Sequence, residues 1–199
     1  MFNTIPGVDE MRKYCLEHLL NGYGFKAKEI QPYREFIRFD VLGINRLKRE
    51  IRIIEIKSCR ADFTSDQKWQ SYLPYCTHFT FAAPKDAITL AELPKGIGLV
   101  EFGYEEKKKG WNGETYHRLD HQYVRGCSKL QERLDDEHYI SLLEGVVMRL
   151  MTENSGRNMF ASIQEELREI QRGIWDIRER LEREDKANAL RKTPRQAGR

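Results

Sequence analysis

Two short runs of β-branched and aromatic residues, joined by a polar stretch, constrain the fold of this chain more than any other feature. The first run covers residues 36–42 (FIRFDVL) and the second covers residues 50–56 (EIRIIEI). Such runs are typical of β-strands, and a short polar connection favours antiparallel pairing of the two. The sequence therefore predicts a β-hairpin at this point of the chain.

The segments around this hairpin predict a mixed α/β domain. Apolar residues at helical spacing indicate helices over residues 8–20 and 64–75. Further strands and one short helix are expected near 26–33, at 78–84, near 87–92 (the helix) and at 98–102. The order of the main elements is thus α-β-β-α-β, with room for another strand near 26–33. Residues 103–135 fit either a hairpin or a loop, and periodicity does not decide between them.

The C-terminal third has a helical pattern. Residues 142–151 carry one amphipathic stripe, and the segment ENSGRN then interrupts it. Beyond the interruption, apolar residues step alternately by three and four, at Phe160, Ile163, Leu167, Ile170, Ile174, Ile177 and Leu181. This heptad seam predicts a coiled coil that joins copies of the chain through residues 157–182, while a long helix packed on its own domain also fits.

Three regions follow from these patterns. Residues 1–135 form the α/β domain, residues 136–185 form C-terminal helices that oligomerise, and residues 186–199 form a basic, disordered tail.

The charge of the chain gives no global argument for a polyanionic partner. Hydrophobic residues make up 40% and charged residues 33% of the sequence, and the net charge is +3. The tail from Lys186 onward holds five basic residues and no acidic one, so the remainder of the chain is net negative. Nucleic-acid binding would need local basic clusters, which also fit a solvated surface. They occur at Lys26/Lys28, Arg46/Lys48/Arg49/Arg52 and Lys107/Lys108/Lys109.

The expected compartment is the cytoplasm. No apolar run approaches the ~20 residues that a membrane span needs, and the N-terminus lacks the basic-then-apolar pattern of a signal peptide. The cysteines are scattered and form no C-x-x-C pair, which suits reduced thiols. They are Cys15, Cys59, Cys76 and Cys127.

The end of the second strand of the hairpin carries candidate chemistry. Glu55 and Lys57 alternate onto one face of this strand, and the hairpin would set Asp40 beside Glu55. Adjacent carboxylates repel each other unless a cation lies between them, and Mg²⁺ is held in proteins by one or two carboxylates. Such an ion acidifies a water and stabilises an attacked phosphate, while Lys57 would orient that water. The three residues predict metal-assisted phosphodiester hydrolysis, although a lone Glu-x-Lys also occurs as exposed charge.

The surroundings of these residues resemble a known family. The segments RFDVLGI, IIEIKSCRADFTSDQKWQSYLPYCTHFTFAAP and LPKGIGLVEF are similar to the MmcB-like DNA-repair endonucleases of the PD-(D/E)XK nuclease superfamily. The resemblance covers roughly residues 8–103, and its most specific part is E-I-K-S-x-x-x-D-F-x-x-D-x-K-W-x-x-Y. It implies a restriction-endonuclease-like core in α-β-β-β-α-β order, with Mg²⁺ or Mn²⁺ as cofactor and DNA as substrate.

The resemblance also implies roles for single residues. Asp40 and Glu55 would bind the metal together with the backbone carbonyl of Ile56, and Lys57 would be the catalytic lysine. Many superfamily members add a glutamate from the first helix.

In this sequence that glutamate would be Glu17 or, alternatively, Glu10. Phe39 stands where the superfamily's name has proline, and the heptad helix has no counterpart in the matched region.

Several neighbouring residues have two interpretations each. Asp62 and Asp66 would border the site or cap a helix, and Lys68 would contact a phosphate or remain an exposed charge. The hairpin-loop residues expected to hold the DNA backbone are Arg46, Lys48 and Arg49. The spacing of Trp69, Tyr72 and Cys76 is more typical of a core stripe than of a base-stacking surface.

A rival metal site lies further along. His117 and His121 are four residues apart, with Cys127 beyond them, and would hold zinc if the segment were helical. No second ligand pair at metal spacing accompanies them, so loop histidines are the favoured interpretation.

Three hypotheses about function follow. The leading one is a metal-dependent DNA endonuclease of DNA repair or recombination, whose coiled coil pairs two active sites. The alternative is a non-catalytic nuclease-fold module that binds DNA or docks a partner through its C-terminal helix. A third keeps the chemistry on RNA, since phosphate contacts do not distinguish the two nucleic acids.

Overall fold

The structure is a computed structural model, which describes residues 5–48, 50–109 and 114–154 and five single residues beyond them. Those five are Arg172, Asp176, Glu179, Arg180 and Arg183. The chain divides into two compact units, Met1–Gly145 and Val146–Arg199. The heptad positions and the basic tail lie outside the described residues, so the coiled coil and the disordered tail stay predictions.

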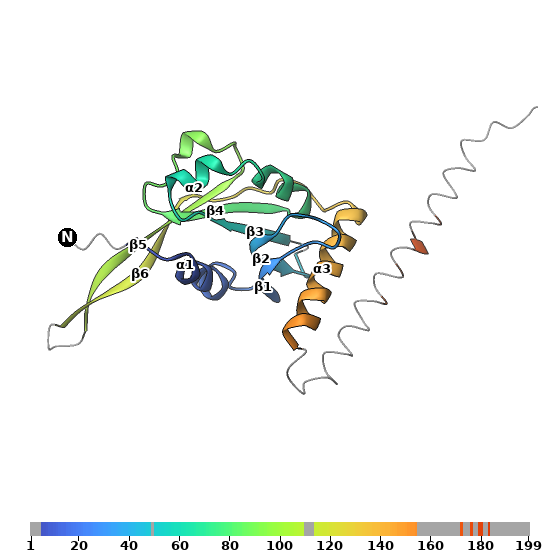
Figure 1. Cartoon of the computed structure of the whole chain (residues 1–199), viewed down its shortest axis with the longest axis horizontal. Coiled ribbons are helices and arrows are strands. Elements are labelled where there is room, and N and C mark those ends of the chain that lie inside the picture. Colours follow the sequence, from blue (N-terminus) through green and yellow to red (C-terminus); the bar gives the residue numbers. More distant parts are fainter. Residues whose placement is uncertain are drawn as a thin grey trace, which may run out of the picture. The chain divides into compact units, whose positions relative to one another are not determined.

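A mixed sheet forms the centre of the first unit (Figure 1). The six strands of the described residues lie side by side in chain order: β1 Phe25–Ile30, β2 Phe39–Asn45, β3 Glu50–Ile56, β4 His78–Pro84, β5 Gly98–Lys109 and β6 Glu114–Arg125. The β1–β2, β2–β3 and β5–β6 pairs are antiparallel, whereas β3–β4 and β4–β5 are parallel. The mixed α/β class is confirmed, and so is the hairpin, in which Val41 lies opposite Ile54.

The first strand of the hairpin begins later than predicted. Strand β2 begins at Phe39 and not at Phe36, because residues 31–38 form a loop. Within this loop Arg34 has a φ of 63°, a left-handed backbone conformation that differs from the extended backbone of a regular strand.

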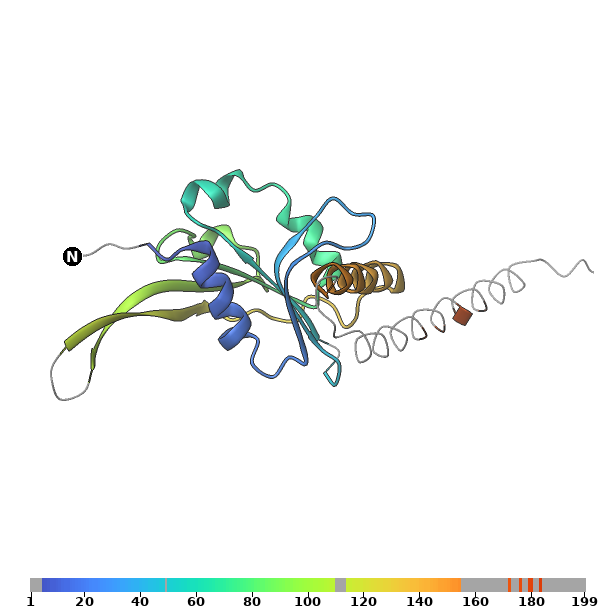
Figure 2. The same ribbon diagram turned by 60° about the horizontal axis from the view of Figure 1, so that its bottom comes forward.

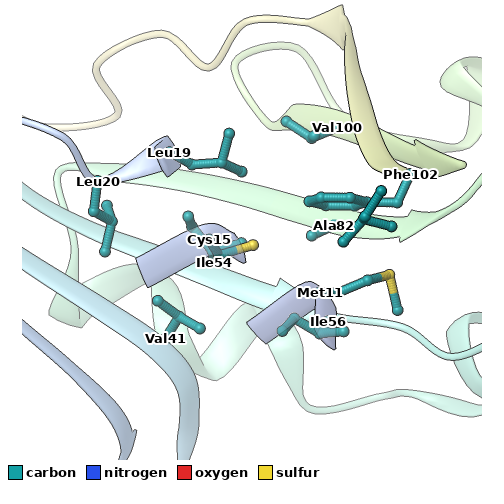
Figure 3. Packing of buried hydrophobic residues seen from close by; sticks show 11 residues of the cluster. Met11, Cys15, Leu19, Leu20, Val41, Ile54, Ile56, Ala82, Val100 and Phe102 are labelled. Carbon is teal, nitrogen blue, oxygen red and sulfur yellow. The ribbon is translucent and has the colours of Figure 1, made fainter. Parts of the chain in front are cut away.

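One face of the sheet packs against the N-terminal helix. Helix α1 (Val8–Tyr14) continues as a π-helical segment, η1 (Cys15–Leu19), and together they match the predicted first helix. Their apolar side chains share one core with strands β2 to β5 (Figure 3); it includes Met11, Cys15, Leu19, Val41, Ile54, Ile56, Ala82, Val100 and Phe102. Since Ile54 and Ile56 face α1, the alternation of the strand turns Glu55 to the opposite face.

The crossover between β3 and β4 covers that opposite face (Figure 2). It contains α2 (Arg60–Ser65) and a 3-10 helix, η2 (Trp69–Tyr75), where the sequence predicts one continuous helix. Asp66 interrupts them: its backbone is extended, and its side chain accepts a hydrogen bond from the backbone N–H of Lys68 (2.7 Å). This local turn competes with helix and explains the difference.

The aromatic residues of this crossover form the second half of the core. Trp69 and Tyr72 are buried, and both rings lie against Phe79 of β4. The prediction of a core stripe that also includes the buried Cys76 is confirmed.

Residues 103–135, for which the sequence leaves a hairpin and a loop open, largely extend the sheet. Strand β5 runs on to Lys109, and β6 pairs with it in antiparallel register. Most side chains over this extension are polar and exposed on both faces, so the apolar alternation that predicts a strand is missing.

The last helix of the described chain, α3 (Asp136–Asn154), begins in the first unit. There the backbone N–H of Tyr33 donates to the carbonyl of Ser141, and the Ser141 hydroxyl donates to the carbonyl of Tyr33 (2.9 Å each). A 3-10 turn, η3 (Leu90–Glu92), precedes β5. Neither α3 nor any other helix among the described residues has the length and apolar character to cross a membrane.

Candidate active site

The hairpin brings Asp40 and Glu55 together at one end of the sheet. Strand β2 starts at Phe39 and strand β3 ends at Ile56, and the antiparallel register pairs Val41 with Ile54. Asp40 and Glu55 are the next residues along these two strands, and the charge of Asp40 acts on Glu55. Adjacent residues across an antiparallel pair have Cβ atoms about 5 Å apart, so their carboxylates act on each other.

Glu55 is a buried carboxylate with an unused oxygen. Its residue is 7% exposed; Oε1 accepts a hydrogen bond from Nζ of Lys57 (3.1 Å), and Oε2 is buried without a hydrogen-bond partner. Burial raises the pKa of Glu55 to about 7, the charge of Asp40 raises it as well, and Lys57 opposes both. An orphaned, charged oxygen of this kind is costly and calls for a cation or a proton.

Lys57 lies between two carboxylates. Its Nζ is 3.1 Å from Oε1 of Glu55 and 2.5 Å from Oδ2 of Asp66, and the residue is 4% exposed. Burial lowers the pKa of Lys57, but the hydrogen bond that it donates to Asp66 and the charge of Glu55 outweigh burial and raise the pKa overall. The side chain is therefore a fixed ammonium ion at the end of β3.

Asp40 is held by a residue from the first helix. Its Oδ1 accepts a hydrogen bond from Arg12 (3.0 Å), and its Oδ2 accepts one from the backbone N–H of Ile56 (3.0 Å). Arg12 also pairs with Asp9 at 2.6 Å and lies 3.9 Å from Glu29. Sequence reasoning missed Arg12, and the only available signal was its position next to Met11 on the edge of the buried helix stripe.

The two glutamates expected from the first helix lie elsewhere. Glu17 is about half exposed and lies 4.0 Å from both Lys13 and His18, and Glu10 accepts a hydrogen bond from the Tyr104 hydroxyl. Among the residues that the structure describes, no three His, Cys, Asp or Glu side chains are grouped to hold a metal ion. Neither glutamate therefore joins the carboxylate pair, and Arg12 is the α1 side chain found there.

The residues after β3 support the site in different ways. Asp62 accepts hydrogen bonds from the backbone N–H (2.8 Å) and the hydroxyl (2.9 Å) of Ser58, which fixes the turn that leaves the strand. Asp66 contacts Lys57 directly, so it belongs to the cluster itself. Lys68 is exposed and follows Asp66 at the start of η2.

The predicted hairpin-loop contacts lie at the other end of the strands. Arg46 and Lys48 belong to the turn between β2 and β3, whereas Asp40 and Glu55 lie where these strands meet the crossover. About five residues at 3.3 Å each separate the turn from the carboxylates, a distance of roughly 17 Å. Arg49 lies outside the described residues.

The rival zinc site is excluded by its secondary structure. His117 and His121 belong to strand β6, where residues four apart are about 13 Å apart, too far to share one ion. His121 uses its Nδ1 in a hydrogen bond with the hydroxyl of Tyr14 (2.9 Å).

The donor atoms at the carboxylate pair fit a hard divalent cation. They are carboxylate oxygens, which Mg²⁺ and Mn²⁺ prefer, and Oε2 of Glu55 has no competing hydrogen bond. Two carboxylates suffice for Mg²⁺, which keeps several of its waters.

Fold and site thus define the class of this protein: an α/β protein whose sheet ends in a carboxylate pair, Asp40 and the buried Glu55, beside a buried lysine. The model of the MmcB-like family, described as DNA repair protein MmcB-like, matches residues 18–109, which include β1 to β5 and the whole carboxylate cluster. This confirms the resemblance stated above: over residues 18–109 the chain is similar to the MmcB-like family.

A solved structure gives a second similarity. It is titled SPO1766 protein of unknown function from Silicibacter pomeroyi, and its sequence is 26% identical to this chain. The match covers 75% of this chain and 92% of the other, with a TM-score of 0.50. No curated protein matches the chain.

Proposed function

We propose that this protein is a divalent-metal-dependent endonuclease that hydrolyses DNA phosphodiester bonds in DNA repair. The observation that carries the proposal is the buried, unpartnered Oε2 of Glu55 beside Asp40, with the ammonium of Lys57 fixed 3.1 Å from the other oxygen. The match to a family described as a DNA repair protein supports DNA as the substrate. We also propose that the domain carrying this site is a member of the PD-(D/E)XK nuclease superfamily.

Three groups of the chain would hold Mg²⁺ or Mn²⁺: the carboxylates of Asp40 and Glu55 and the backbone carbonyl of Ile56. A cation bound there supplies a Lewis acid for the phosphate and lowers the pKa of a bound water.

The chain's own residues have separate tasks in this proposal. Asp66 and Glu55 hold Lys57 so that its ammonium stays in place beside the attacked phosphate and offsets negative charge. Arg12 and the N–H of Ile56 fix the orientation of the Asp40 carboxylate. Such fixed groups cost no reorganisation when charge develops.

The same cluster gives a specific reason for a second candidate, a non-catalytic module that binds DNA or docks a partner. Arg12 and Lys57 already lie against Asp40, Glu55 and Asp66, so ion pairs compensate much of the negative charge without a metal. Buried ion-pair clusters of this kind also occur as purely structural features.

The deciding experiment incubates the full chain with plasmid, continuous duplex and branched DNA in Mg²⁺, Mn²⁺ or EDTA. Two variants accompany it: Lys57→Ala, and Lys95→Ala as a matched loss of one exposed lysine at the opposite end of the sheet. We expect cleavage that needs metal and Lys57 but not Lys95. Binding without cleavage on every substrate would favour the second candidate, and cleavage that survives in a folded Lys57→Ala would contradict the assigned site. A thermal melt of each variant shows that it is folded.

Pairing of two such sites through the heptads at 160–181 is part of the proposal. Light scattering on the full chain and on a chain ending at Ser155 tests it: the full chain should have at least twice its 23.6 kDa mass, and the shorter chain should be monomeric.

A further inference from the structure

The loop between β1 and β2, residues 31–38, presents two aromatic side chains to solvent, Tyr33 in part and Phe36 almost completely. Phe36 is 99% exposed, and the side chains of Arg34 and Arg38 on either side of it are exposed as well. Exposing a whole phenyl ring forgoes about 2 kcal/mol of burial. An apolar ring between two guanidinium groups is a combination that binds nucleic acids, because bases stack on the ring and phosphates pair with the cations.

The loop is held in place, so the exposure of Phe36 belongs to an ordered segment. The backbone N–H of Tyr33 donates to the carbonyl of Ser141 in α3, and the Ser141 hydroxyl donates to the carbonyl of Tyr33 (2.9 Å each). The Gln31 side chain donates to the carbonyl of Glu35 (2.5 Å), and the Arg34 guanidinium lies 5.1 Å from the centre of the Tyr33 ring. Arg34 keeps a left-handed backbone within this frame, a conformation that persists only where the surroundings fix it. The loop is therefore preorganised, which lowers the entropic cost of binding.

The loop leads directly into the candidate active site. Phe39 opens strand β2, its ring lies 5.3 Å from the ring of Tyr72 in η2, and Asp40 follows it (Figure 2 shows the loop beside η2). Burial raises the pKa of Tyr72, Glu55 raises it further and Arg38 opposes both. Arg38 and the carboxylate cluster thus act on one neighbourhood, and a nucleic acid placed on the cluster passes this loop.

We propose that Phe36 stacks on a nucleobase next to the phosphate held at Asp40 and Glu55, with Arg34 and Arg38 on the flanking phosphates. This inference rests on the proposed function, from which it takes the position of the DNA. In continuous duplex every base is already stacked on its neighbours, and opening one step costs a few kcal/mol. The protein therefore prefers DNA that already contains an unpaired or unstacked base at the reacting position, such as a bulge, a flap or a junction.

Charge decides between a nucleic acid and the other occupants of such a surface. A protein partner or a second copy would have to place apolar side chains over Phe36 and a carboxylate at each of Arg34 and Arg38, whereas bases and phosphates alternate along every DNA strand. A DNA strand satisfies the ring and both cations together. Continuity with the carboxylate cluster favours the same choice.

The test measures DNA binding by fluorescence anisotropy in EDTA, where no cleavage occurs, with full-length protein. The probes are a continuous duplex and the same duplex with one unpaired 2-aminopurine, whose fluorescence reports stacking. The variants are Phe36→Ala, Phe36→Trp and, as a matched control, Leu47→Ala, which removes a 98% exposed apolar side chain at the far turn of the hairpin.

We expect Phe36→Ala to weaken binding of the bulged probe about 5- to 100-fold and that of the duplex much less. Quenching of 2-aminopurine should vanish in Phe36→Ala and persist in Phe36→Trp and Leu47→Ala. Equal weakening on both probes, no weakening, or a drop in oligomer mass of Phe36→Ala by light scattering would overturn the inference. If binding of the bulge depends on Phe36 but no substrate is ever cleaved, the proposed catalysis fails and this inference stands; if cleavage occurs without preference for the bulge, the reverse holds.

Discussion

Replacing Glu55 by glutamine should stabilise the metal-free protein at alkaline pH and leave its stability unchanged in acid. In the folded protein burial and Asp40 raise the pKa of Glu55 to about 7, against 4.5 for the free side chain. A carboxyl group whose pKa is raised in the folded state does not destabilise the protein below pH 4.5, where it is protonated in both states. Its destabilisation of the folded protein grows as the pH rises towards 7. The difference in pKa, at 1.36 kcal/mol per pH unit, corresponds to about 3 kcal/mol above pH 7.

Urea unfolding of the wild type and Glu55→Gln in EDTA, at intervals between pH 4 and pH 8, measures this difference directly. The amide keeps the shape of the carboxyl group, and its oxygen still accepts the hydrogen bond from Lys57. The difference in free energy of unfolding should therefore rise from near zero at pH 4 to about 3 kcal/mol in favour of Glu55→Gln at pH 8. Glu114→Gln, at an exposed position, is the control and should show no such rise. A wild type as stable as Glu55→Gln at pH 8 would refute the view that burial and Asp40 outweigh the stabilisation of the Glu55 charge by Lys57.

Two further substitutions test the supports of the site. Arg12→Met keeps the apolar stem of the side chain but removes its hydrogen bond to Asp40. We expect urea unfolding to show a free energy of unfolding lower by about 2 kcal/mol. An unchanged free energy of unfolding would mean that Arg12 does not hold Asp40. Gly145→Ala should destabilise by about 1–3 kcal/mol, although alanine favours helix, because its Cβ would lie 2.1 Å from the carbonyl oxygen of Gln31. A more stable Gly145→Ala would show that α3 does not rest on the loop that carries Phe36.

The sequence predicts best those elements whose residues are mostly apolar, because such residues are buried in the core. Strand β4 and the second strand of the hairpin begin and end as predicted, because apolar β-branched and aromatic residues meet polar or proline boundaries there. Alternation along β3 also predicts that Glu55 and Lys57 share a face. The polar β5–β6 extension lacks this signal, and its pairing depends on the neighbouring strand.

The supporting residues of the site depend on tertiary contacts that no local pattern reports. Arg12 reaches Asp40 from another element, twenty-eight positions away, and Asp66 meets Lys57 only because its own turn interrupts the crossover helix. Family resemblance suggests a glutamate on the first helix, whereas the side chain that faces the site is decided by how α1 lies on the sheet. The sequence predicts Phe36 as the first residue of a strand, whereas the structure shows it as an exposed loop residue.

The proposed endonuclease requires a divalent cation bound by Asp40 and Glu55, and calorimetric titration of the protein with Mn²⁺ in the absence of DNA tests this binding directly. We predict binding that Asp40→Asn and Glu55→Gln each weaken by at least about 10-fold. Glu17→Gln should bind as the wild type does, because Glu17 lies outside the cluster. Equal binding by the wild type and both cluster variants, or no binding by the wild type, would contradict the metal site and with it the proposed endonuclease.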